Sequence, residues 1–120
     1  MGLDMYLQAH PTGTRDVDEV GSWRKANQVH GWFNRRYGGL ENCVSVDVLR
    51  YDLLALRATC EIVLDNPSKG PDLLPCTQGF FFGGEDYGAW YERDLRETIS
   101  IVDKALALPP KWRLSYYAWW

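Results

Sequence analysis

The residues of this sequence that could do chemistry are few and widely spread. The chain has two histidines, His10 and His30, and three cysteines, Cys43, Cys60 and Cys76, without a Cys-x-x-Cys pair. A structural zinc site takes four Cys or His ligands at short paired spacings, so we expect no metal site. Signatures such as GxGxxG, GxxxxGKS/T, HExxH and GxSxG do not occur. The sequence therefore predicts no catalytic residue and no cofactor, and it favours a binding protein over an enzyme.

A polar and aromatic cluster is predicted where two helices meet. Helical spacing places His30 on one face with a tryptophan seven residues earlier and an asparagine three residues earlier. On a later helix, Asp94 shares a face with two tyrosines and offers acceptor oxygens. Buried polar groups need partners, which leaves open a structural network, a ligand pocket or, less favoured, catalysis by His30 with Asp94. The pocket would be lined by Trp23, Asn27, His30, Tyr87, Tyr91 and Asp94.

The aromatic content predicts an exposed binding surface. Phe, Trp and Tyr make up 14% of the chain, which is more than one small core has to bury. Consecutive rings, as in the run 80–82 and at the C-terminus, cannot all face the same side of a regular element. Exposed aromatics beside arginines are typical of interface hot spots. We therefore predict a partner-binding surface made of Trp32, Arg35, Arg36, Phe81, Glu85, Asp86, Trp119 and Trp120.

The elements that must position these residues begin with a strand at each end of the chain. Apolar residues alternate over positions 3–9 and again over 111–120. A two-stranded ribbon is only marginally stable, so we expect a further strand near 43–46 or 80–82. The predicted fold class is α+β, with a small antiparallel sheet that includes the N- and C-terminal strands and packs against about three helices.

Three helices are predicted between the terminal strands. Residues 10–21 are expected to form a loop, after which Ser22 caps a helix that ends near residue 37. Apolar residues at helical spacing predict a second helix that ends near residue 64 and a third helix over 86–108. The prolines and glycine of 67–75 predict an extended loop.

Composition limits the class of protein. A length of 120 residues predicts a single domain over 1–120. The net charge of −3 argues against a general nucleic-acid binder, and no apolar run reaches the roughly 18 residues of a membrane span. An odd number of separated cysteines predicts a reducing cytoplasm rather than a disulfide framework, with Cys60 as a small core residue.

Several segments, taken in order, resemble a family of small phage and prophage proteins. They are the opening MGLDMYL, then WRKAN at 23–27 with His30 and Trp32-Phe33, then GFFFG at 79–83 with Tyr87, Tyr91, Asp94-Leu95 and Thr98-Ile99. The likeness covers most of the chain, and 40–75 matches in character only. It implies a phage or mobile-element accessory protein in the bacterial cytoplasm, and it supplies no catalytic residues.

Three functional hypotheses follow. Small phage proteins often bind and block a host machine, so the first is an inhibitor of a bacterial defence system such as a CRISPR–Cas effector, which binds a host protein complex. The second is a small-molecule or nucleotide-binding protein, either a signal sponge or a minor enzyme, with a pocket between the first and third predicted helices. The third is homo-oligomerisation through the aromatic C-terminus.

Overall fold

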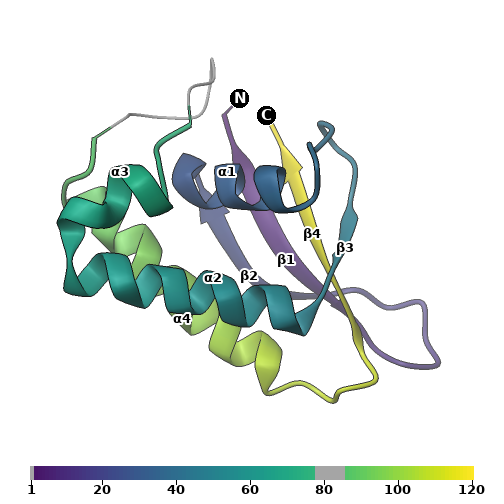
Figure 1. Cartoon of the computed structure of the whole chain (residues 1–120). Coiled ribbons are helices and arrows are strands. Elements are labelled where there is room, and N and C mark those ends of the chain that lie inside the picture. Colours follow the sequence, from purple (N-terminus) through teal and green to yellow (C-terminus); the bar gives the residue numbers. More distant parts are fainter. Residues whose placement is uncertain (1, 78–85) are drawn as a thin grey trace.

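The computed structural model describes residues 2–77 and 86–120 (Figure 1). Phe81 and Glu85, both predicted to bind a partner, lie outside the described residues. The strands are β1 Asp4–His10, β2 Asp18–Arg24, β3 Val46–Val48 and β4 Arg113–Trp119. The α-helices are α1 Asn27–Arg36, α2 Arg50–Asp65, α3 Gly70–Leu73 and α4 Ala89–Leu106, with the 3-10 helix η1 Pro67–Lys69 between α2 and α3.

The strands form one antiparallel sheet in the order β2-β1-β4-β3. The N- and C-terminal strands are therefore its two central strands, and both chain ends lie at the same end of the sheet (Figure 1). Each central strand has a partner on both sides, although β3 covers only the segment 114–116 of β4, so most of their backbone N–H and C=O groups are paired. The predicted α+β fold, with a sheet that includes both terminal strands, is confirmed.

The two sides of the sheet differ because side chains alternate along each strand. Met5 and Leu7 of β1 are fully buried on the side that packs against the helices. Tyr6 points to the opposite side and pairs with Tyr117 of β4, with ring centroids 6.2 Å apart. We call this opposite side, which also carries Asp4 and Trp119, the outer face. It is more exposed than the helix-covered side.

An aromatic stack joins α1 to the sheet within the core. Phe33 of α1 lies parallel to the ring of Tyr116 on β4, with centroids 4.0 Å apart, and both side chains are buried. Cys60 of α2 is fully buried, as predicted, and burial raises the pKa of its thiol to about 12. A thiol with so high a pKa stays protonated at neutral pH and fills space like a small apolar side chain.

The predicted start of the first helix at Ser22 is wrong. Ser22 and Trp23 belong to β2, where they pair with Tyr6 and Met5 of β1, and α1 begins only at Asn27. The apolar spacing that placed Trp23 on the helix also fits one buried position on an edge strand. Pairing with β1 satisfies the backbone of this segment, so the tertiary partner overrides the local pattern.

Two further differences concern the linkers between helices. The segment predicted as an extended loop over 67–75 instead contains η1 and α3, because Pro67 occupies the first turn of a helix, where its missing N–H costs nothing. The extra strand expected near 43–46 is β3, displaced slightly toward the C-terminus.

Among the described residues, no helix is long and apolar enough to cross a membrane.

Gly21→Ala is expected to destabilise the fold by roughly 1–3 kcal/mol. A Cβ atom on Gly21 would lie 2.5 Å from Cγ1 of Ile101 on α4, and Ile101 is itself buried. Urea unfolding measures the change, with Ser22→Ala at the exposed neighbouring position as the control. Equal unfolding free energies for wild type and Gly21→Ala would mean that β2 and α4 do not approach each other as described.

Candidate functional site

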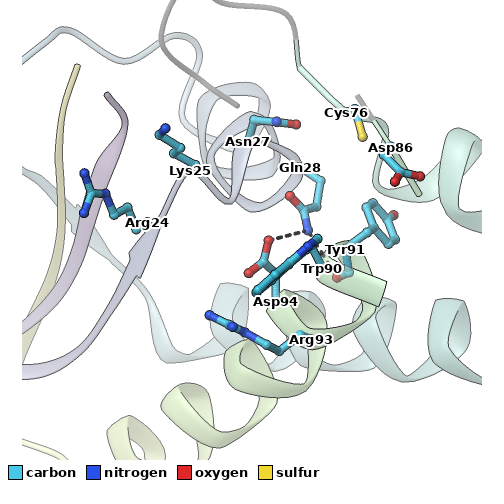
Figure 2. Close-up of a pocket in the computed structure, with 10 residues that line it drawn as sticks. All are labelled: Arg24, Lys25, Asn27, Gln28, Cys76, Asp86, Trp90, Tyr91, Arg93 and Asp94. Carbon is cyan, nitrogen blue, oxygen red and sulfur yellow. Dashed lines mark hydrogen bonds between the residues drawn. The ribbon is translucent and has the colours of Figure 1, made fainter. Parts of the chain in front are cut away.

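A cavity of about 470 Å³ lies between the end of β2 and the N-terminal turns of α1 and α4 (Figure 2). Its volume falls within the range of small-molecule sites, roughly 300–1,000 Å³. The lining combines cationic, acidic, amide and aromatic side chains. They are Arg24, Lys25, Asn27, Gln28, Cys76, Asp86, Trp90, Tyr91, Arg93 and Asp94.

The chain reverses direction sharply at Lys25, directly after β2, and this turn places Lys25 at the edge of the cavity. Lys25 has a φ of 58°, in the left-handed region that costs a non-glycine residue about 1–2 kcal/mol. Its N–H donates to the carbonyl of Leu3 at 2.7 Å, and its own carbonyl accepts from the N–H of Asn27 at 2.9 Å. These bonds hold the turn, so Lys25 lies at the edge of the cavity directly before α1, while the Arg24 side chain points away from Gln28 and Asp94 (Figure 2) and lies 4.0 Å from Asp4.

Two buried amides form the wall contributed by α1. Asn27 is 3% exposed and Gln28 is 2% exposed. Asn27 Oδ1 accepts the backbone N–H of Thr77 at 2.9 Å, while Gln28 Nε2 donates to Asp94 Oδ2 at 3.3 Å and to the carbonyl of Tyr91 at 3.4 Å. Within the described part of the chain, Gln28 Oε1 accepts no hydrogen bond. Because Gln28 lines the cavity, this oxygen can accept a hydrogen bond from a ligand there.

Asp94 is a half-buried carboxylate on the α4 side of the cavity. Burial raises its pKa to about 6, a rise that the hydrogen bond from Gln28 partly offsets. Glu97 raises the pKa further through its like charge, and Arg93 lowers it. Asp94 is therefore mainly ionised at neutral pH, and its Oδ1 atom has no hydrogen-bond donor among residues 2–77 and 86–120.

Trp90 supplies a flat aromatic surface at the mouth. Its side chain is 71% exposed, although it begins a helix whose other side packs in the core. The guanidinium of Arg93 lies 4.7 Å from the Trp90 ring centroid, which is a cation–π arrangement. Figure 2 shows Trp90 next to Asp94 and Gln28, so a flat surface adjoins the hydrogen-bonding groups.

The charged groups at the cavity are of both signs. Lys25 and Arg93 stand beside the carboxylates Asp86 and Asp94, while Arg24, also in the lining, lies 4.0 Å from Asp4 in an ion pair. The first turn of α1 contains no acidic residue, so the positive end of its helix dipole adds to the cations. The cavity can therefore bind an anion and a planar ring together.

The predicted pocket residues divide between this cavity and the core. Asn27, Tyr91 and Asp94 line the cavity, whereas Trp23, His30 and Tyr87 are not part of its lining. The Trp23 indole donates to Thr98 Oγ1 at 2.8 Å. Tyr87 packs on Tyr91, with ring centroids 4.9 Å apart, and its hydroxyl accepts the N–H of Cys76.

His30 belongs to a structural network beneath α1. Its Nδ1 lies 2.8 Å from the hydroxyl of Tyr116, and its ring meets Trp120 edge to face at 4.9 Å. Burial lowers the pKa of His30 to about 4, so the imidazole is neutral at physiological pH. The sequence had suggested that His30 and Asp94 share a network; in the structure Gln28 is the residue that reaches Asp94.

The predicted partner-binding residues lie at three separate places in the fold. On α1, the guanidinium of Arg36 lies 5.7 Å from the Trp32 ring centroid and forms an ion pair with Asp52 at 2.7 Å, and Arg35 borders the same depression. At the end of β4, Trp119 is 38% exposed and Trp120 is half-buried against His30. Asp86 is exposed and lines the cavity.

Sequence reasoning missed Arg24, Lys25, Gln28, Trp90 and Arg93 as site residues. A usable signal was present, because two consecutive cations precede the amides of α1, and a tryptophan stands three residues before an arginine on α4. What the pattern could not supply was the contact between the two segments.

The chain has no match among protein-family models, curated proteins or solved structures. The assignment of a ligand therefore rests on the cavity itself.

Replacement of His30 should change how stability depends on pH. The unfolded chain protonates this histidine near pH 6.5 and the folded chain only near pH 4, so stability present above pH 6.5 is lost as the pH falls toward 4. The loss amounts to about 3 kcal/mol. His30→Gln keeps a polar side chain that does not titrate, so its stability should lack this pH-dependent contribution.

Urea unfolding of wild type and His30→Gln between pH 4 and 7 measures this pH-dependent loss of stability. The stability advantage of the wild type should shrink by about 3 kcal/mol across that range, and the opposite contribution of Asp94, whose folded-state pKa is raised, cancels because both proteins contain it. Parallel pH profiles would contradict the burial of a neutral imidazole.

Proposed function

We propose that this protein binds a small anionic molecule with a planar ring, of the nucleotide class, in the cavity between α1 and α4. The observation that carries the proposal is that Lys25, Arg93 and the N-terminal turn of α1, which contains no acidic residue, adjoin one cavity. Cations gathered at a concave, partly apolar volume are what a phosphate-bearing small molecule requires.

The remaining lining supports a ring beside the anionic group. Trp90 offers an exposed indole face next to the buried amides, and stacking of one base on an aromatic side chain contributes about 1–3 kcal/mol. Gln28 and Asp94 hold acceptor atoms that donors on a ring edge could meet. These groups act by charge, stacking and hydrogen bonding, which suits capture of a ligand, such as the sequestration of a nucleotide signal.

Lys25→Asn should weaken ligand binding without harm to the fold. Asparagine adopts the left-handed conformation more readily than most residues, so the turn at φ 58° is retained while one cation is removed. We expect the melting temperature to stay within a few degrees of wild type and the affinity for nucleoside monophosphates to fall about tenfold. Isothermal titration calorimetry with mono- and cyclic nucleotides measures the affinity.

Lys69→Asn is the matched control, because Lys69 is an exposed cation on η1 outside the cavity lining. Its affinity for the same nucleotides should equal that of wild type. Failure of every nucleotide to bind wild-type protein at millimolar concentration would overturn the proposed function.

A second candidate is inhibition of a bacterial defence complex such as a CRISPR–Cas effector, as the resemblance to phage proteins implies. The observation that favours it is the row of aromatics on the outer face, where Tyr6 and Tyr117 adjoin and Trp119 stands at the strand end. Aromatic residues carry much of the binding energy at protein interfaces. Arg113 on the same face forms an ion pair with Asp47.

A plating assay separates the two candidates. In bacteria whose CRISPR–Cas system targets a phage, expression of an inhibitor should restore phage plating. Under the second candidate, Trp119→Ala should reduce that restoration at least tenfold while it keeps the wild-type melting temperature, and Lys25→Asn should restore plating fully. Absence of restoration by wild type against each effector class would contradict the candidate, as would full restoration by Trp119→Ala.

A further inference from the structure

We propose that the cavity selects guanine among the nucleobases, with Asp94 and Gln28 as the residues that read its edge. This inference rests on the proposed function and specifies its ligand. It follows from which hydrogen-bonding atoms face the cavity and which of them the protein leaves without partners.

The two residues present one donor and an unusual excess of acceptors. Asp94 contributes two carboxylate oxygens. Among the residues that the structure describes, Oδ2 receives a hydrogen bond from Gln28 Nε2 at 3.3 Å and Oδ1 receives none. The second bond of Gln28 Nε2, to the Tyr91 carbonyl, is also long at 3.4 Å. Both distances exceed the usual 2.7–3.2 Å of a strong N–H···O bond, so this amide can turn to a better acceptor at small cost.

This set of atoms matches the edge of guanine. Guanine carries adjacent N1–H and N2–H donors, which a carboxylate such as Asp94 can accept on its two oxygens, and the neighbouring O6 can accept the Gln28 N–H. Adenine and cytosine each offer only one donor group and one adjacent acceptor, so one carboxylate oxygen would remain unpaired. Xanthine places a carbonyl oxygen where guanine has its amino group, and that oxygen would face the carboxylate.

The residues around Asp94 and Gln28 would position the phosphate and the ring of the nucleotide. Trp90 adjoins Asp94 on the same helix and offers its indole for stacking, while Lys25 lines the cavity from the turn before α1 (Figure 2). A base seated between Trp90 and Asp94 would thus direct its phosphate toward Lys25 and the N-terminus of α1.

The ionisation of Asp94 adds a pH dependence. The groups that face this carboxylate are Gln28 from α1, Arg93 and Glu97 from α4, and Lys25 from the turn before α1. With a pKa of about 6, Asp94 loses its charge as the pH falls below 6 and then offers one acceptor fewer. Affinity for guanine nucleotides should therefore fall as the pH is lowered through 6.

The test compares GMP with XMP, in which a carbonyl oxygen replaces the 2-amino group of the base and the ring nitrogen N3 is ionised at neutral pH, by calorimetric titration at pH 7.5. Wild-type protein should bind GMP at least about tenfold more tightly than XMP, the discrimination expected of a bidentate contact. Asp94→Asn replaces one acceptor oxygen by an N–H donor, so it should reverse the preference in favour of XMP. If Asp94 had a purely structural role, Asp94→Asn would lower the affinity for GMP and XMP by the same factor.

Glu92→Gln is the matched control, because Glu92 lies on α4 next to the site but outside the cavity lining, and it should keep the GMP preference. The control at low pH is Asp94→Asn. Since the phosphate of GMP also gains a proton near pH 6, the GMP affinity of this variant should fall less between pH 7.5 and 5.5 than that of wild type. Binding of nucleotides without a preference for GMP, or without reversal in Asp94→Asn, overturns the guanine inference and leaves the proposed function standing. Absence of any nucleotide binding overturns both.

Discussion

The reversal of the chain at Lys25 is the constraint on which the cavity depends. β2 must pair with β1 along one edge of the sheet, and α1 must return across the sheet to stack Phe33 on Tyr116. A left-handed residue, fixed by the bond from its N–H to the carbonyl of Leu3, joins these two requirements within three residues. As a result Lys25 and the two amides of α1 line the same cavity. α4, held to β2 by the Trp23–Thr98 hydrogen bond, supplies the opposite wall.

The cavity also contains groups that do not serve stability. A left-handed lysine and a carboxylate whose pKa is raised by burial each carry a cost to the folded state. The other buried polar groups nearby are satisfied inside the fold, as His30 is by Tyr116. Several destabilising features at one place are typical of a functional site, because residues that serve binding are often not the residues that would stabilise the fold most.

The sequence predicted the fold well where local pattern and tertiary structure agree. Alternation at both chain ends gave the central strands, and helical spacing gave most of α2 and α4. Prediction failed at Ser22, where the pairing partner is β1, distant in sequence. For the site, helical spacing brought in Asn27, Tyr91 and Asp94, but Gln28 and Trp90 were missed. Their role depends on how α1 and α4 cross, which packing decides and which no single helix reveals.

The central claim is that the ligand occupies the cavity between α1 and α4, and an NMR titration tests it most directly. In ¹H–¹⁵N spectra of the labelled protein with added GMP, we expect shifts of the Trp90 indole N–H, the Gln28 side-chain amide and the backbone amides of 24–28. The indole signals of Trp23 and Trp119, in the core and on the outer face, should stay unchanged. Shifts confined to Trp119 and the outer face, or no shifts at saturating nucleotide, would contradict the account.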